Sequence, residues 1–269
     1  MHRVLLAALV ASLAYCATAS AAPRDDCHAK ATRDLQRLSP HGHAIYLAMT
    51  DKKLFLTWVG CDDLQLGLST AVHESVHILT EEKDGFPLIG GGFIRRPHEV
   101  SKFFAPKELA HGFGKKDIYV QTYLRPGAAS SADDFLFLLD ELNAYSHDLS
   151  SAVRLVPLHR PGNGEVAHRD GLSALMSFVM SYVDTARRTK PATWEGLQRA
   201  EPRKVVQTLW SQAETALASS CALPAFGRDD RTSIGFVCDH KNSGALAELL
   251  GRPPACPREC LAPGTAALR

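Results

Sequence analysis

The stretch His73-Glu74-Ser75-Val76-His77 has the spacing H-E-x-x-H. On an α-helix, residues four apart differ by only about 40° around the axis, so His73 and His77 present two imidazoles to one point. Two converging imidazoles suit a zinc ion. Glu74 lies about 100° further round, close enough to bond a water at the metal but poorly placed as a ligand. The motif therefore predicts metal binding by the two histidines and proton transfer by Glu74.

The residues around the motif predict that it lies on a helix. Apolar residues recur at helical spacing from Val72 to Leu79, and Ser69 or Thr70 is a suitable N-cap. Asp84-Gly85 is a stop signal. Because zinc needs its imidazoles held rigidly, a helix packed on a core through one apolar stripe suits the site.

The first 21 residues have the pattern of a secretory signal peptide. A short basic start precedes apolar residues 4–14, and Ala19-Ser20-Ala21 is an A-x-A cleavage site. A lipid anchor on Cys16 is the alternative, which the bulky Tyr15 fits poorly. No other segment approaches the roughly 18 apolar residues of a membrane span. We therefore expect export to the periplasm or the medium, with an alanine-rich leader typical of bacteria, and no membrane insertion.

Removing the leader leaves an even number of cysteines, which in an exported chain predicts up to three disulfides. They are Cys27, Cys61, Cys221, Cys238, Cys256 and Cys260. Two lie near the mature N-terminus and four near the C-terminus, so some bridges are expected to join the two ends. Metal binding by the pair Cys256 and Cys260 is a weaker alternative, because no second Cys/His pair lies nearby.

Composition limits the partners. The net charge of +1, from 30 basic and 29 acidic residues, provides no broad field for nucleic acid or anionic lipid. We expect a monomer in which residues 22–220 form the catalytic domain. This domain would combine a sheet and the motif helix in 22–130 with a helical half in 131–220, and residues 221–269 would form a Cys/Pro-rich tail packed on it.

The N-terminal half is expected to contain a small sheet. A helix is predicted over 26–38, capped by Asp25 or Asp26. Four β-prone segments follow. They are 44–49 and 54–59, which suggest a hairpin, then 86–94, which contains three glycines, and 117–124.

The second half has helical periodicity over 133–153, 171–188 and 203–220. The middle helix carries a broad apolar stripe that predicts core packing. Its members are Leu172, Leu175, Met176, Val179, Met180 and Val183. After Cys221 the periodicity is lost, so residues 221–269 are expected to be irregular and held by disulfides.

A catalytic zinc site needs a third protein ligand, and Glu141 is the best candidate. Its helical neighbours are mostly apolar, and burying a carboxylate among them costs several kcal/mol unless a cation compensates. Asp140, by contrast, shares its stripe with Asn143 and His147, which indicates a wetter face. The alternative for Glu141 is an ion pair with a lysine or arginine in the core.

Other third ligands remain open. Glu99 and His98 follow Pro97 in a segment that should begin as a loop. His147 would point about 240° away from Glu141 on the same helix. A third histidine in the pattern H-E-x-x-H-x-x-G-x-x-H is excluded, because Thr80 and Lys83 occupy the last two positions.

The chain resembles a zincin metallopeptidase of the gluzincin type, in which a glutamate on a later helix completes the site begun by H-E-x-x-H. The resemblance covers His73, Glu74, His77 and Glu141. It departs from the thermolysin pattern, whose third ligand lies much nearer the second histidine. The resemblance implies an α+β zincin-like fold with a small antiparallel or mixed sheet packed on the motif helix, one Zn²⁺ per chain, and a peptide or protein substrate.

In the expected mechanism, Glu74 takes a proton from a water at the zinc as that water attacks a carbonyl, and passes it to the leaving nitrogen. The Tyr145 hydroxyl could stabilise the oxyanion, with His98, His111 and His147 as alternatives, although core packing is the favoured interpretation of Tyr145. The segment 86–94 or 117–124 could pair with an extended substrate. Two further functions stay open, an inactive zincin-fold binding protein and a zinc hydrolase of non-peptide amide bonds.

Overall fold

The computed structural model describes residues 23–160 and 167–261. The predicted signal peptide 1–21 and the alternative anchor at Cys16 lie outside these residues. The described chain is mainly helical, with one sheet of two short antiparallel strands. Within the described ranges, no helix combines the length and apolar character needed to cross a membrane.

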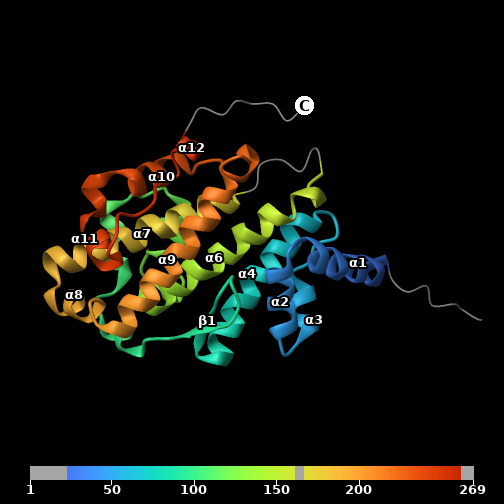
Figure 1. Ribbon diagram of the computed structural model, residues 1–269, viewed down its shortest axis with the longest axis horizontal. Coiled ribbons are helices and arrows are strands. Elements are labelled where there is room, and N and C mark those ends of the chain that lie inside the picture. The colour runs from blue at the N-terminus through green and yellow to red at the C-terminus, as the bar shows by residue number, and fades with distance from the viewer. Residues whose placement is uncertain (1–22, 161–166, 262–269) are drawn as a thin grey trace, which may run out of the picture.

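Three long helices lie side by side at the centre, with α6 in the middle (Figure 1). They are α4 (Leu64–Lys83), α6 (Phe135–Arg154) and α9 (Ala200–Ser220). Helix α7 (His168–Thr189) packs against α6 and α9. All six residues of its predicted apolar stripe are 0 % exposed, so this prediction is confirmed. The three predicted helices of the second half correspond to α6, α7 and α9.

Helix α4 carries the motif and begins earlier than predicted. Asp63 is its N-cap and accepts a hydrogen bond from the backbone N–H of Leu66. The predicted caps Ser69 and Thr70 therefore lie inside the helix. Gly67, in the first turn, has no β-carbon, and this allows the helix to pack directly against the backbone of Gly60. The predicted stop is confirmed, since Asp84 adopts the left-handed conformation with φ of 48°.

Helices α4 and α6 run antiparallel, and polar contacts fix their register. Near one end the side chain of Gln65 donates to the carbonyl oxygen of Ala152. Near the other end His77 contacts Asp140. Because these two contacts are about three turns apart along each helix, they determine which residues of α6 face the motif histidines.

The N-terminal region is helical, and the predicted hairpin over 44–59 is wrong. Its helices are α1 (Pro23–Leu38), α2 (Pro40–Ala48) and α3 (Lys52–Thr57). Helix α2 starts with a proline, and α3 is capped by the side chain of Asp51, so capping chemistry outweighs the β-propensity of the apolar residues. Helix α1 begins before Asp25 and Asp26, which therefore do not cap it.

The sheet follows the motif helix instead of preceding it. Strands β1 (Gly85–Pro87) and β2 (Phe93–Arg95) pair antiparallel, with Phe86 opposite Ile94. The three glycines form the turn, where Gly91 and Gly92 have positive φ. Strand β1 contacts both α4 and α6.

A long segment of short helices joins the hairpin to α6. It contains the 3₁₀ turns His98–Lys102, Pro106–Gly112 and Ser130–Ala132, and the helix α5 (Ile118–Tyr123). The predicted strand over 117–124 is therefore wrong. Asp117 caps α5 by accepting from the backbone N–H groups of Tyr119 and Val120, which favours a helix over a strand.

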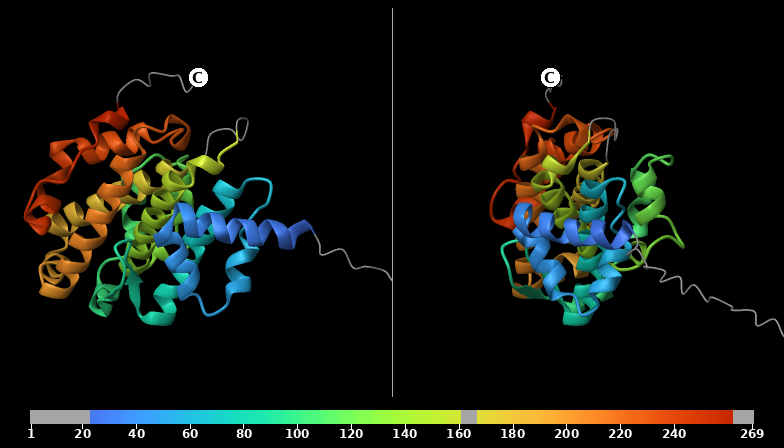
Figure 2. Two further views of the ribbon diagram at one scale, coloured as in Figure 1. Left: turned by 45° about the vertical axis from the view of Figure 1, so that its right-hand side comes forward. Right: turned by 90° about the vertical axis from the view of Figure 1, so that its right-hand side faces the viewer.

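The C-terminal region is also more regular than predicted, and it lies at the opposite end of the molecule from α1–α3 (Figure 2). After the 3₁₀ turn Val156–Leu158, α7 leads to α8 (Pro191–Leu197). Beyond α9 come the turn Pro224–Phe226, α10 (Arg231–Cys238), α11 (His240–Leu250) and α12 (Arg258–Leu261). Helices α10 and α11 pack on α7, so their short apolar stripes join the main core.

The described residues contain three disulfides, and each is local. They join Cys27 to Cys61, Cys221 to Cys260 and Cys238 to Cys256. The expectation that bridges join the two ends of the chain is therefore wrong. The first bridge joins α1 to the loop before α4. The second joins the end of α9 to α12, and the third joins the end of α10 to the segment before α12. Disulfides are consistent with a protein that folds outside the cytoplasm.

Candidate metal centre

The two motif histidines converge as their spacing on α4 predicts. Their Nε2 atoms lie 3.2 Å apart, with the ring planes at 75° to each other. Two nitrogens that bind one zinc ion at about 2.0–2.1 Å in tetrahedral geometry lie about 3.3 Å apart. The separation of the two imidazoles therefore suits a shared metal ion.

The packing of α6 on α4 brings Glu141 to the same point. Its Oε2 atom lies 3.6 Å from Nε2 of His77 and 4.0 Å from Nε2 of His73. This oxygen is buried and has no hydrogen-bond partner. Among the described residues, His73, His77 and Glu141 form a group whose ligand atoms all lie within 4.8 Å of one another. A buried oxygen without a donor, facing two imidazole nitrogens, fits a zinc ion.

The pKa values of the three residues also fit a metal site. Burial and the neighbouring His77 lower the pKa of His73 to about 3, so this ring is neutral and its nitrogen can bind a metal. Burial raises the pKa of Glu141 to about 7. Burial alone would lower the pKa of His77, but the hydrogen bond and charge of Asp140 raise it to about 9. The protein without metal thus holds a proton on His77, and a metal cation would replace that proton.

Asp140 corrects one expectation, because it does not lie on a wet face. It is 4 % exposed, and its Oδ2 atom accepts a 2.6 Å hydrogen bond from Nδ1 of His77. The polar stripe that it shares is buried because Asn143 and His147 both donate to the carbonyl oxygen of Pro87 in β1. A carboxylate on Nδ1 fixes the tautomer of His77 and keeps its Nε2 lone pair directed at the metal position.

Tyrosines stand beside the metal ligands. The ring of Tyr145, one turn after Glu141, packs edge-on against His73 with centroids 4.7 Å apart. Its hydroxyl lies 2.8 Å from the hydroxyl of Tyr123 in α5. Burial raises the pKa of both phenols, so both keep their protons at neutral pH. Two hydroxyls that share one hydrogen bond leave one O–H free to donate to a third group.

These side chains border a cavity of about 290 Å³, called the tyrosine cavity below. It extends from His73 towards the N-terminus of α4 and is bordered by residues of α5, α6 and the start of α7. Its lining residues are Leu66, Thr70, His73, Glu74, Tyr119, Tyr123, Tyr145, Asp148, Ala167 and His168. The tyrosine cavity therefore contains one proposed ligand, the candidate base Glu74 and the candidate hydroxyl of Tyr145.

Gly171 in α7 makes room for Tyr145. A β-carbon at this glycine would lie 2.0 Å from Cε1 and 2.5 Å from Cδ1 of the tyrosine ring. Glycine costs about 1 kcal/mol relative to alanine inside a helix. The glycine lies where the ring of Tyr145 touches the backbone of α7, so the absence of a side chain at Gly171 allows the tyrosine ring to occupy this position at the edge of the cavity.

The alternative ligands lie elsewhere. His98 is exposed and pairs with Asp84 at 2.7 Å, and Glu99 is outside the group that could hold a metal. His147 points to Pro87, away from the metal centre, as its position on the helix predicts. Cys256 and Cys260 are both in disulfides and are not free to bind a metal.

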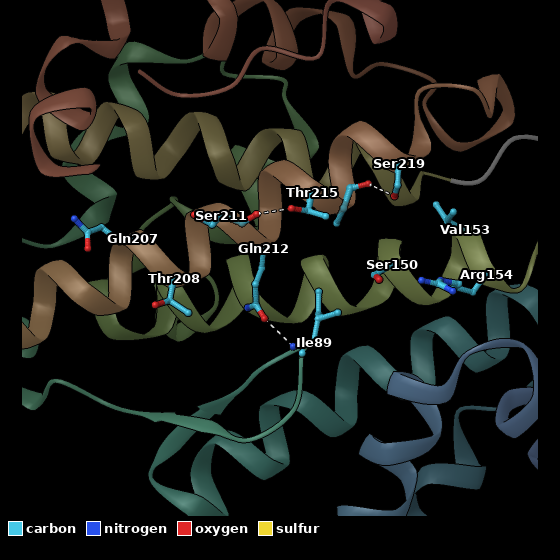
Figure 3. Close-up of a pocket in the computed structure, with 12 residues that line it drawn as sticks. Ile89, Ser150, Val153, Arg154, Gln207, Thr208, Ser211, Gln212, Thr215 and Ser219 are labelled. Atoms are coloured by element: carbon cyan, nitrogen blue, oxygen red, sulfur yellow. Dashed lines mark hydrogen bonds between the residues drawn. The ribbon is translucent and has the colours of Figure 1, made fainter. Parts of the chain in front are cut away.

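A larger cavity of about 710 Å³ lies on the opposite side of α6 (Figure 3). Ser150 of α6 lines it and is about 180° from Glu141 around the helix. Figure 3 shows Gln212 of α9 reaching the backbone N–H of Ile89 at the hairpin tip. The twelve lining residues include no His, Cys, Asp or Glu, so this cavity has no group suited to metal or acid–base chemistry. The hairpin tip, Ile89 and Gly90, borders this cavity, and the pairing of 86–94 with an extended substrate stays a prediction.

Sequence reasoning missed Tyr119 and Tyr123. In a strand, positions 119 and 123 would share a face but lie about 13 Å apart. In α5 the two tyrosines are four residues apart and lie on one helical face towards Tyr145. The signal that could have found them is Asp117, which is suited to cap a helix that starts at Ile118.

No family model, curated protein or solved structure matches this chain.

Replacing Asp140 by asparagine tests its role at His77. The amide oxygen can still accept from Nδ1, but the charge is lost, so we expect the zinc affinity to fall by about tenfold. Asp133→Asn is the control, because Asp133 is exposed and pairs with Lys107. Zinc titration with a competing chelator measures both variants. Equal affinities would show that Asp140 does not support the metal ligand.

A double-mutant cycle tests the contact between Gly171 and Tyr145. In the wild type, Gly171→Ala should destabilise the protein by about 1–3 kcal/mol, because the methyl group overlaps the ring. In a Tyr145→Ala background the same change should stabilise it by up to about 1 kcal/mol, because alanine favours the helix. Urea unfolding gives the free energies. The same sign in both backgrounds would contradict the proposed contact.

Proposed function

We propose that this chain is an exported zinc-dependent peptidase in which His73, His77 and Glu141 hold the metal and Glu74 is the general base. The observation that carries the proposal is the buried Oε2 atom of Glu141, which has no donor and faces the Nε2 atoms of both motif histidines. A zinc ion held there would act as a Lewis acid that polarises a carbonyl oxygen and makes water more acidic.

Glu74 is the proposed proton-transfer group, and its position beside His73 supports this role. It follows His73 on α4, so its carboxylate points about 100° away from the ligand direction and lines the tyrosine cavity. In the proposed reaction Glu74 takes a proton from water as the water oxygen bonds to the carbonyl carbon. The C–N bond then breaks, and Glu74 gives the proton to the leaving nitrogen.

The tyrosine pair supports the same reaction. The hydroxyls of Tyr123 and Tyr145 share one hydrogen bond, and their remaining O–H can donate to the oxyanion that forms on the substrate. Tyr145 therefore has a proposed role beyond packing, and Tyr123 becomes its partner.

A second candidate function is hydrolysis of a compact, non-peptide amide. The wall that faces the motif helix across the tyrosine cavity is helix α5, which offers side chains and no free strand edge. An extended polypeptide could not add to a sheet there. This wall favours short substrates, whether small peptides or other amides, and a panel of both classes separates them.

The substitution Glu74→Gln tests the proposed base. It should keep zinc bound, because Glu74 is not among the ligand atoms, and should lower kcat by about a hundredfold or more. Glu82→Gln, an exposed position near the end of the same helix, is the control and should leave both properties unchanged. Turnover of a short-peptide library, followed by mass spectrometry, measures kcat. An unchanged rate in Glu74→Gln would remove Glu74 as the base.

A further inference from the structure

The walls of the tyrosine cavity have a defined aromatic geometry. The rings of Tyr119 and Tyr123 are nearly parallel, at 11°, with centroids 6.5 Å apart. The ring of Tyr145 stands almost perpendicular to both, at 76° and 87°, with centroids 6.4 and 6.0 Å away. Three phenol rings therefore meet at a corner of the cavity. The face of an aromatic ring carries negative charge density that attracts a cation within about 6 Å.

Acidic side chains line the cavity, and one of them is paired with a histidine. Of its ten described lining residues, Glu74 and Asp148 carry carboxylates, and none is a lysine or an arginine. Asp148 accepts a 2.9 Å hydrogen bond from Nδ1 of His168. Burial raises the pKa of Asp148, but the charge and hydrogen bond of His168 lower it overall, so this carboxylate is ionised. An anionic group entering the cavity would meet Glu74 and the Asp148–His168 pair in a partly desolvated space.

An apolar side chain stands beside these charges. Leu66 lines the tyrosine cavity while remaining 39 % exposed. Large aliphatic groups at the surface are suited to contact an aliphatic stem. Two carboxylates with no lysine or arginine among the described lining residues, an aromatic corner and the exposed side chain of Leu66 together match one kind of ligand, a positively charged nitrogen on an aliphatic chain.

We infer that the tyrosine cavity is the specificity pocket of the site and binds a cationic nitrogen of the substrate, next to the bond that is cleaved. As a statement about substrate, this inference rests on the proposed function. The cation can come from a lysine-type side chain or from the amino terminus of a short peptide. In either case a substrate with a carboxylate at that position is disfavoured.

A binding experiment tests the pocket without requiring catalysis. Tetramethylammonium cannot ligate a metal, and tert-butanol is a neutral probe of similar shape. Saturation-transfer NMR with the purified, zinc-loaded protein should show binding of tetramethylammonium at least about tenfold tighter than that of tert-butanol. Tyr119→Leu should weaken binding of the cation and leave that of tert-butanol unchanged. Tyr46→Leu is the control, because Tyr46 packs against Phe55 outside the tyrosine cavity. Equal binding of the two probes, or equal binding of the cation by wild type and Tyr119→Leu, would overturn the inference.

Peptide hydrolysis then distinguishes the two sources of the cation. A preference for lysine over norleucine assigns the pocket to a side chain, and a preference for a free over an acetylated amino terminus assigns it to the chain end. Cation binding with no hydrolysis of any peptide would support the pocket while contradicting the peptidase proposal. Hydrolysis with no preference for either cation would support the peptidase proposal while overturning the pocket.

Discussion

The antiparallel packing of α4 against α6 is the constraint on which the candidate site depends. His77 and Glu141 are 64 residues apart in sequence, and only the register of these two helices brings them together. Gln65 against Ala152 and His77 against Asp140 fix that register. A slip of one turn along α6 would place Phe137 or Tyr145 opposite the histidines and leave two imidazoles without a carboxylate.

Much of the second half of the fold could be predicted from sequence, because α6, α7 and α9 are long and bury broad apolar stripes. The helical periodicity of these apolar residues can be read from the local sequence without knowledge of tertiary contacts. The short elements could not be predicted in this way. In α2, α3 and α5 a few apolar residues fit a strand or a helix equally well, and proline or aspartate at the first positions decides the outcome. The C-terminal helices depend on contacts with α7, which the sequence does not display.

In the candidate site, too, some features follow from the local sequence and others from tertiary packing. The spacing of His73, Glu74 and His77 on one helix, and the apolar surroundings of Glu141, are local properties that identified the proposed ligands. Asp140 could not be identified, because its burial depends on β1 accepting the hydrogen bonds of neighbouring polar residues. Tyr123 and Gly171 matter through Tyr145, and both contacts join helices far apart in sequence. Sequence thus indicated the chemistry, whereas packing determined which residues surround it.

Zinc stoichiometry and affinity, compared between the wild type and a Glu141→Ala variant, test the central claim most directly. The account predicts one zinc per wild-type chain and an affinity lower by more than about a hundredfold in the variant, with an unchanged far-UV circular dichroism spectrum. Glu99→Ala should bind zinc like the wild type. A wild type that takes up no zinc after reconstitution, or a Glu141→Ala variant that binds zinc as tightly as Glu99→Ala, would contradict the account.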